Sequence, residues 1–329
     1  MQVERSAQPG RDVDMAPVWT LSDGHAGNVR QAAALAAALG IDARDWRLTA
    51  RTPWRWAAPR MLPGADAAFG NDYAQALRQP PRVAIGCGRQ GALATRLAGR
   101  AGARTVQILD PRIDPHHWDL VIAPEHDGLR GDNVLTVTGS LHPVDDAWLA
   151  AAREAHPALG SLPGPRTALL LGGPSRHVDF DVAAFERLAA MLLPRIAAEG
   201  GSLLATVSRR TPPDIINALR ARAADLPAVC WTGPGDGANP YAGLLAWADR
   251  IVCSADSVNM LSEASATRVP VFVAEPDRVR GRPRQFIDAL LSRGRLRALD
   301  AALAPFDVEP LRETARIAAL VRARLDLRD

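Results

Sequence analysis

The sequence predicts an α/β protein built from two tandem, doubly wound, Rossmann-like domains. Apolar stretches such as "APVWTL", "RVAIG" and "TALLLGG" have the composition of buried strands, and each is followed by a helical pattern. This strand-then-helix rhythm stops at the Pro- and Gly-rich stretch 156–166 and then begins again. The chain has 329 residues, which is long for a single hydrophobic core. We therefore expect two domains that face an interdomain cleft.

The domain borders follow from these patterns. Residues 1–15 are polar, and we expect a disordered lead-in there. Residues 16–156 should form the first domain and residues 157–309 the second, with the linker at 156–166. Residues 310–329 contain an amphipathic helix with an apolar stripe, which we expect to cross back to the first domain.

Composition narrows the class of protein. Hydrophobic residues make up 47% of the chain and charged residues 23%, as in soluble globular proteins. No apolar stretch approaches the ~20 residues of a transmembrane helix, and the N-terminus lacks the apolar segment of a signal peptide. We therefore expect a cytoplasmic protein. Cys87, Cys230 and Cys253 lack metal-binding spacing, so we expect them to be inert core residues.

The charge of the chain indicates no nucleic-acid partner. The net charge is only +3, and all 39 basic residues are arginine. This complete absence of lysine is a general bias of the sequence, so the abundance of arginine is weak evidence for binding phosphate or nucleic acid. Individual arginines have to be judged by their positions.

Three residues of the first domain are candidate catalytic bases. Ligands of open parallel sheets bind beyond the carboxyl ends of the strands, so the loops that follow strands are the places to search. Asp23 and His25 lie in "TLSDGHAGNVRQ" after the first strand, and His126 lies in "APEHD" after a later one. A lone histidine in a loop is more often structural than catalytic, so which of the three acts stays open.

A second loop of the first domain matches the dinucleotide-binding fingerprint. In "AIGCGRQGA", Gly86, Gly88 and Gly91 follow a strand and open a helix, and Asp110 ends the next strand. An NAD-dependent oxidoreductase is therefore one alternative. Two features weaken it: the motif is not in the first strand–helix unit, and the "LDPR" context of Asp110 indicates a conformational role.

The loops of the second domain have the residues of a phosphate-binding site. "LLLGGPSRH" combines two glycines with a serine, which lets backbone amides approach a diphosphate. "TVSRRTP" adds two guanidinium groups that can bind phosphate. The stretch "IVCSADSVNMLSEA" runs from a strand through a polar turn into a helix, where Asp256 and Ser257 are N-cap candidates. The residues we expect to bind a nucleotide are Gly172, Gly173, Ser175, Ser208, Arg209, Arg210, Ser254, Ser257, Asn259, Met260 and Glu263.

Glu263 is a carboxylate within a helix of small and apolar residues. Its neighbours Met260, Leu261 and Ala264 make a fully exposed face improbable for this helix. A carboxylate can accept both hydrogen bonds of a ribose diol. We therefore predict that Glu263 is partly buried and faces a nucleotide.

Several of these motifs together resemble a known family. "LSDGHAGNVRQ", "LDPRIDPHHWDLVIAPEHD", "LLLGGPSRH", "TVSRRTPPD" and "ANPYAGLLAWADRIVCSADSVNMLSEA" are similar, in this order, to motifs of the "elongated mitochondria" proteins of plant mitochondrial fission and their bacterial relatives. The bacterial members are described as glycosyltransferases of the GT-B fold. The second domain also resembles the donor half of the lipid-linked N-acetylglucosaminyltransferases of peptidoglycan synthesis, although Arg268 stands where glycine is expected.

The resemblance implies a metal-independent glycosyltransferase without a cofactor. It would take its sugar from a nucleotide diphosphate, with a UDP-sugar expected, and transfer it to a cell-envelope or lipid-linked acceptor. The enzyme would then be cytoplasmic and peripheral on the inner membrane. A non-catalytic GT-B scaffold that recruits a partner to a membrane is the main alternative.

A stretch rich in tryptophan and arginine, "DWRLTARTPWRWAAPRML", bears on the acceptor. Aromatic residues beside arginine suit a membrane interface and also single-stranded nucleic acid. Packing of these tryptophans on the first domain is an equally good explanation. The implied chemistry favours the lipid-facing interpretation.

Overall fold

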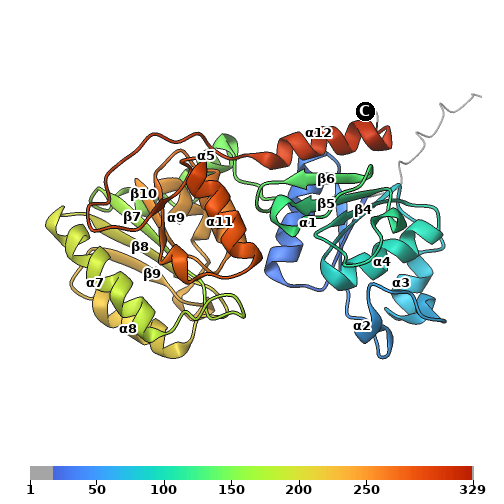
Figure 1. Ribbon diagram of the computed structural model, residues 1–329, viewed down its shortest axis with the longest axis horizontal. Coiled ribbons are helices and arrows are strands. Elements are labelled where there is room, and N and C mark those ends of the chain that lie inside the picture. Colours follow the sequence, from blue (N-terminus) through green and yellow to red (C-terminus); the bar gives the residue numbers. More distant parts are fainter. Residues whose placement is uncertain (1–17, 328–329) are drawn as a thin grey trace, which may run out of the picture. The chain divides into compact units, whose positions relative to one another are not determined.

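The computed structural model describes residues 18–327, so the predicted lead-in at 1–15 lies outside the described residues. By internal contacts the described chain divides into two compact units. The first comprises residues 18–122, 131–133 and 325–327, and the second comprises 123–130 and 134–324. The described chain contains two parallel sheets with helices on their faces, as Figure 1 shows.

The first sheet has the strand order β2-β1-β3-β4-β5-β6. Its strands are β1 (Val18–Ser22), β2 (Ala43–Arg47), β3 (Val83–Cys87), β4 (Arg104–Ile108), β5 (Leu120–Pro124) and β6 (Val134–Val137). The helices of this part of the chain are α1 (Ala26–Ala38), α2 (Trp54–Ala57), α3 (Asn71–Ala76) and α4 (Gly88–Arg100). Trp19 and Leu21 of β1 pack with α3 and α4 in one buried cluster.

The second sheet has the strand order β12-β11-β10-β7-β8-β9. Its strands are β7 (Arg166–Leu171), β8 (Ser202–Val207), β9 (Ala228–Trp231), β10 (Arg250–Ser254), β11 (Val271–Ala274) and β12 (Arg297–Ala298), and all neighbouring pairs are parallel. The helices are α5 (Asp146–Ala155), α6 (Pro157–Gly160), α7 (Val182–Ala198), α8 (Pro213–Ala223), α9 (Tyr241–Trp247), α10 (Val258–Ser265), α11 (Arg282–Ser292) and α12 (Glu313–Leu325).

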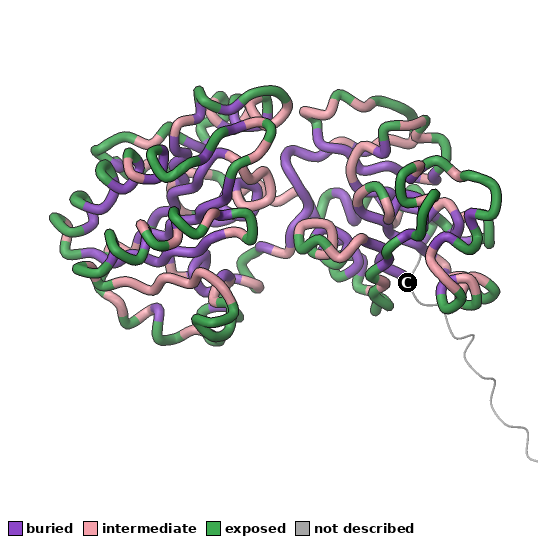
Figure 2. Tube along the Cα trace, turned by 90° about the horizontal axis from the view of Figure 1, so that it is seen from below, coloured by how far each residue is buried: buried purple, intermediate pink, exposed green. Residues whose placement is uncertain are grey.

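Two apolar layers enclose the second sheet. Alternate strand residues face opposite sides, so Leu169 and Val252 pack against α7 and α8, whereas Leu170 and Ile251 pack against α5, α9, α10 and α11. Figure 2 shows the buried residues concentrated on the strands and the exposed residues along the outer helices. This two-sided burial explains why the strands read as continuous apolar runs. The predicted doubly wound α/β class is confirmed.

Local predictions held for most elements but missed β2. This edge strand, "ARDWR", is mostly exposed and has no hydrophobic alternation, so its sequence gives no strand signal. The stretch 156–166 is also more structured than a linker, because it contains α6, whose Leu159 is buried. Cys87 and Cys253 are buried, Cys230 is half-buried, and all three are free thiols. The predicted domain borders, including the crossing of the last helix, stay a prediction.

His142 is a buried base that the sequence did not single out. It is 4% exposed, and its backbone amide donates to the Thr314 hydroxyl, which in turn donates to the His142 carbonyl. The ring nitrogen Nδ1 has no partner among the described residues. Burial, reinforced by the nearby charge of Arg312, lowers the pKa of His142 from 6.5 to about 4.

This pKa shift predicts a loss of stability in mild acid. Between about pH 6.5 and 4 the unfolded chain binds a proton that folded His142 does not, so stability falls as the pH falls through this window. The full effect is roughly 3 kcal/mol. Thermal melting of His142→Gln from pH 7.5 downwards should show a smaller loss than the wild type.

His116 provides a control of opposite sign. Its ring contacts Asp114 and Asp132, which raise its pKa, so its contribution is stabilising at low pH and is lost as the pH rises. Replacing His116 should therefore increase the loss of stability at low pH. Identical pH profiles for His142→Gln and the wild type would contradict the assignment.

Candidate functional site

The strand order of the second sheet places a topological switch point between β7 and β10, and we call this position the crevice. If the six strands are renumbered in chain order from β7, their order across the sheet is 3-2-1-4-5-6. The chain therefore adds strands on one side of β7 first and then, from β10 onward, on the other side. Helix α7 after β7 packs on one face, and α10 after β10 packs on the other. Loops that leave a sheet in opposite directions open a crevice beyond the strand ends. Here the crevice lies at residues 172–175 and 254–257.

Asp256 ties the loops around this crevice together. Its carboxylate accepts the Gly173 amide at 2.8 Å, the Ser254 hydroxyl at 2.7 Å and the Arg210 guanidinium at 2.8 Å. The side chain is 0% exposed. Asp256 therefore connects the loops that follow β7, β8 and β10. The N-cap of α10 is Ser257, so the prediction that Asp256 caps this helix is wrong, and the Asp256 carboxylate is held by the other loops instead.

The two glycines of the β7 loop serve this contact. A Cβ atom on Gly172 would lie 1.9 Å from an Asp256 carboxylate oxygen, and one on Gly173 would lie 2.3 Å from the Arg210 carbonyl. The Gly172 amide donates to the Ser254 hydroxyl at 2.7 Å. Both amides therefore already have hydrogen-bond partners within the chain. The glycines allow close approach to an internal carboxylate.

Helix α10 is fixed at both ends. Ser257 caps its start by accepting the Met260 amide at 3.3 Å, as the sequence predicts. At its end, the buried guanidinium of Arg295 donates to the carbonyls of Ser265 and Thr267, each at 2.8 Å. A cation at the carboxyl end of a helix is favourable because it meets the negative end of the helix dipole.

The remaining first-turn residues of α10 border the crevice. Val258, Asn259 and Met260 are half-buried. Helix geometry leaves the first backbone amides of α10 without acceptors in the helix. The Ser257 hydroxyl accepts the amide of Met260.

Glu263 is more deeply buried than we predicted. It is 2% exposed, and it accepts the Tyr241 hydroxyl of α9 at 2.5 Å. Tyr241 was not singled out from the sequence, because a tyrosine in an apolar helix pattern gives no sign of its hydroxyl's partner. The pair lies among small and apolar residues, so the Tyr241 hydroxyl provides part of the polar environment that a buried carboxylate needs.

The candidate residues of the β8 loop differ in whether their side chains already have partners within the protein. Arg210 is committed to Asp256, and Ser208 accepts the Arg210 amide at 3.1 Å within a turn closed by Thr211. Arg209 is exposed and has no ion pair or side-chain hydrogen bond among residues 18–327. Ser175, in the β7 loop, accepts the His177 amide at 3.2 Å. Arg209 is thus the cation of this set that remains available to a ligand.

In the first unit, Asp23 and His25 form a pair at another switch point. The order of the first sheet reverses between β1 and β3, and both residues follow β1. The Asp23 carboxylate lies 2.9 Å from His25 Nδ1 and accepts the Asn28 side-chain amide at 3.0 Å. Burial raises the pKa of Asp23, but hydrogen bonds from Asn28 and His25 outweigh it, so the net shift is downward.

His126 lies in the segment 123–130, which belongs to the second compact unit. It lies in a 3-10 helix, Glu125–Asp127, after β5. Its ring lies 5.5 Å from that of Phe286 on α11, and the adjacent Asp127 pairs with Arg282 at 2.7 Å. Burial lowers the pKa of His126, so the ring is neutral at pH 7.

The dinucleotide-like glycines are explained by packing. A Cβ atom on Gly86 would lie 2.6 Å from the Thr95 methyl, one on Gly88 2.5 Å from the Asn28 amide, and one on Gly91 2.5 Å from the Leu21 carbonyl. Asp110 forms an ion pair with Arg112 at 3.2 Å and accepts its amide at 2.8 Å, which stabilises a turn. The fingerprint therefore carries no independent support for NAD.

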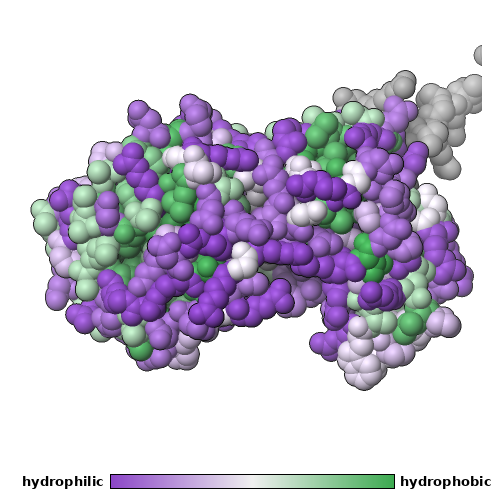
Figure 3. Space-filling view, in the orientation of Figure 1, coloured by the Kyte–Doolittle hydropathy of each residue, from purple (hydrophilic) through white to green (hydrophobic). Residues whose placement is uncertain are grey.

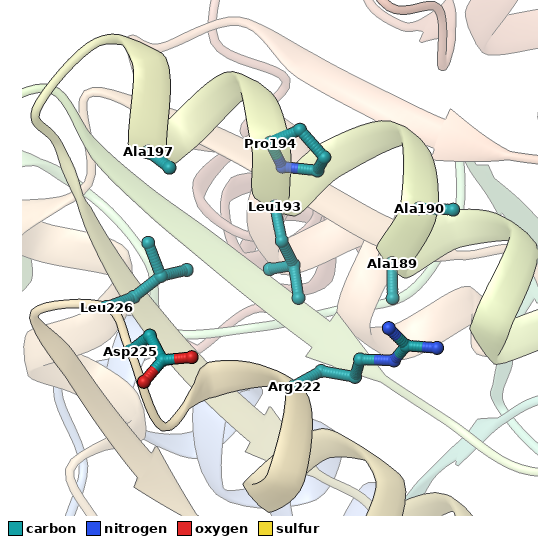
Figure 4. Close-up of a pocket in the computed structure, with 8 residues that line it drawn as sticks. All are labelled: Ala189, Ala190, Leu193, Pro194, Ala197, Arg222, Asp225 and Leu226. Carbon is teal, nitrogen blue, oxygen red and sulfur yellow. The ribbon is translucent and has the colours of Figure 1, made fainter.

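Other features lie away from the crevice. A cavity of about 260 Å³ lies between α7 and α8 and is lined mainly by apolar side chains such as Leu193 and Leu226, which Figure 4 shows. Leu226 lies two residues before β9, so this cavity lies toward the amino ends of the strands. Within residues 18–327 no group of three or more His, Cys, Asp or Glu side chains could hold a metal ion. No helix of this range is long and apolar enough to cross a membrane.

Comparison with known proteins identifies the family. The model of a family described as "Mitochondrial fission ELM1" matches residues 26–325. The chain belongs to this mitochondrial fission family. The mitochondrial fission protein ELM1 of Arabidopsis thaliana is 30% identical over 279 residues, which cover 75% of this chain and 65% of that protein. The chain thus spans slightly less than two thirds of that relative's length.

Solved structures confirm the GT-B-like fold. A UDP-GlcNAc 2-epimerase from Methanocaldococcus jannaschii has a TM-score of 0.58 at 13% identity, over 92% of this chain and 91% of that one. A UDP-glucosyltransferase from Polygonum tinctorium has a TM-score of 0.50 at 12% identity, over 95% and 93%. Such low identities establish the fold alone.

Arg268, which stands where the resembled enzymes have glycine, forms an ion pair in this structure. Its guanidinium pairs with Asp146 of α5 at 2.8 Å, and Arg312 pairs with the same carboxylate at 2.7 Å. Hydrogen bonds from Arg312 and Arg268 hold the pKa of Asp146 well below its usual range. Arg268 therefore joins α5 to the loop that precedes β11.

Gly172→Ala tests the contact between the β7 loop and Asp256. The added methyl would overlap the buried carboxylate, so we expect the free energy of unfolding to fall by about 1–3 kcal/mol. Gly235→Ala is the matched control, since a Cβ atom there meets nothing within 4 Å. Chemical denaturation of both variants measures the effect. Equal stabilities of the two variants would show that the loop does not close on Asp256 as described.

Proposed function

We propose that this chain is a metal-independent glycosyltransferase that binds a UDP-sugar at the crevice between β7 and β10. The observation that carries the proposal is the buried Glu263 on α10, whose start borders that crevice. The Glu263 carboxylate accepts the Tyr241 hydroxyl, and a carboxylate can also accept hydrogen bonds from a sugar diol. Glu263 would accept hydrogen bonds from the ribose diol. Related folds that bind UDP-sugars support this assignment by analogy.

In this proposal the diphosphate binds at the start of α10. The β7-loop amides already serve Ser254 and Asp256. The first amides of α10 and the guanidinium of Arg209 would therefore meet the charge that develops on the leaving diphosphate. Asn259 and Met260 would line the same ligand.

In this proposal a histidine base would activate the acceptor, and His25 is the first candidate. The Asp23 carboxylate holds His25 Nδ1, which leaves Nε2 of this exposed ring as the atom that takes the proton of the acceptor hydroxyl. The hydroxyl oxygen then bonds to the anomeric carbon while the bond to the diphosphate oxygen breaks, and the diphosphate leaves with the electron pair. His126 is the second candidate base. The acceptor we propose is a cell-envelope or lipid-linked hydroxyl.

One observation favours a second candidate function, a non-catalytic scaffold. The glycine-rich loop of the second unit is already closed on the chain's own carboxylate, Asp256. A scaffold that retained the fold and lost its ligand would need such an internal replacement. A well-folded protein that binds no UDP, GDP, CMP or sugar derivative of these in a thermal-shift screen would support the scaffold.

Glu263→Gln tests the ribose site. Glutamine keeps the size of the side chain and an acceptor for Tyr241, but it loses the negative charge that strengthens hydrogen bonds from the diol. We expect the Kd for UDP, measured by titration calorimetry, to rise about tenfold or more. Glu154→Gln, on the exposed face of α5, is the control. The ribose assignment fails if both variants bind UDP as tightly as the wild type.

Activity should survive a chelator. The residues proposed to meet the diphosphate are amides and an arginine, so EDTA should leave UDP release from the UDP-sugar unchanged. The assay compares initial rates with and without EDTA in the presence of acceptor. Loss of activity that Mg²⁺ or Mn²⁺ restores would contradict this mechanism.

A further inference from the structure

One segment of the first unit exposes an aromatic side chain on a well-anchored loop. Trp56 of α2 is 75% exposed, and it is the one exposed residue among the chain's eight tryptophans. Leu62, six residues later, is 37% exposed. Figure 3 shows that hydrophobic residues on the face turned to the viewer form small separate groups among hydrophilic ones. An indole exposed to this extent is therefore unusual for this surface.

The loop that carries Trp56 is held by α4. Arg96 donates to the Pro59 carbonyl at 2.7 Å, and Arg89 donates to the Arg55 carbonyl at 3.2 Å. The Trp54 indole closes the segment by donating to the Pro63 carbonyl at 3.1 Å. Trp54 is half-buried against the core, whereas the side chain of Trp56 faces solvent. The exposure of Trp56 is thus imposed by an ordered backbone.

The charged residues of the segment 51–62 are all arginines. No Asp or Glu occurs between Trp46 and Ala65. Most arginines with short contacts elsewhere in residues 18–327 pair with carboxylates. Four exposed arginines on or beside the segment have no carboxylate partner among the described residues: Arg51, Arg55, Arg60 and Arg89. The guanidinium groups remain available to an external anion.

We propose that residues 51–62 together with Arg89, here called the α2 surface, dock the protein on an anionic lipid bilayer. Trp56 and Leu62 enter the interface between headgroups and acyl chains, where an indole has both apolar and hydrogen-bonding surroundings. The four arginines contact lipid phosphates, and their apolar stems lie along the interface. Figure 1 shows α2 at the lower edge of the first unit, where such an approach is unobstructed within that unit.

The chemistry of the α2 surface favours lipid over nucleic acid. Binding of single strands relies on several aromatic rings that stack successive bases. Here a single indole is exposed, and its apolar neighbour is the aliphatic Leu62, which no base stacks upon. The proposal is independent of nucleotide binding, so it holds for a transferase and for a scaffold alike.

Vesicle binding by the full chain, without nucleotide, tests the proposal. We expect co-sedimentation with phosphatidylcholine vesicles that contain phosphatidylglycerol, little binding to phosphatidylcholine alone, and weakening by salt. Trp56→Ala and the double change Arg55→Gln, Arg60→Gln should each weaken binding at least about tenfold. Met191→Ala and Arg280→Gln, exposed residues of the second unit, are the matched controls and should bind as the wild type does.

Three results would overturn the proposal. One is binding that is equal for wild type and α2-surface variants. Another is tighter binding of single-stranded oligonucleotides that the same variants abolish, which would assign the surface to nucleic acid. The third is a concentration-dependent dimer that Trp56→Ala dissociates and that binds no vesicles. A blue shift of tryptophan emission on vesicles that Trp56→Phe removes would place Trp56 itself in the lipid.

Discussion

The carboxylate of Asp256 is the contact on which the geometry of the second unit's crevice depends. It gathers an amide from the β7 loop, a guanidinium from the β8 loop and a hydroxyl from the end of β10. A buried carboxylate is costly unless its lone pairs are satisfied, so these partners are constrained to meet it. The absence of a side chain at Gly172 follows directly, because Asp256 fills that space. One charge thus sets the positions of three loops.

The same contact determines what remains for a ligand. With the β7-loop amides used internally, the first turn of α10 and Arg209 are the positive groups that are left at the crevice. Ser257 and Arg295 hold α10 at its two ends, and Tyr241 holds Glu263. The site is therefore rigid where a ribose would bind. In the β7 loop it differs from a phosphate-binding glycine loop, in which the amides face the ligand.

The sequence allowed the fold to be predicted more fully than the site. The apolar runs of β7, β8 and β10 are visible because both faces of these strands are buried, whereas β2 is an exposed edge with a polar sequence. The candidate site residues lie in strand-end loops or in the helix that follows one, but the contacts of two of them join distant parts of the chain. Asp256 and Arg210 are separated by 46 residues, and Tyr241 and Glu263 by 22. No local pattern announces such pairs, so the roles of Asp256 and Tyr241 emerged only from the structure.

Hydrogen exchange followed by mass spectrometry, with and without saturating UDP, is the most direct test of the nucleotide site. It reports where a ligand binds, so it separates the β7–β10 crevice from the glycine-rich loop of the first unit. The account predicts slower exchange in peptides that cover the start of α10, residues 254–263, with no change at residues 86–91. Unchanged exchange at 254–263 at saturating UDP, or protection at 86–91 by NAD, would contradict it.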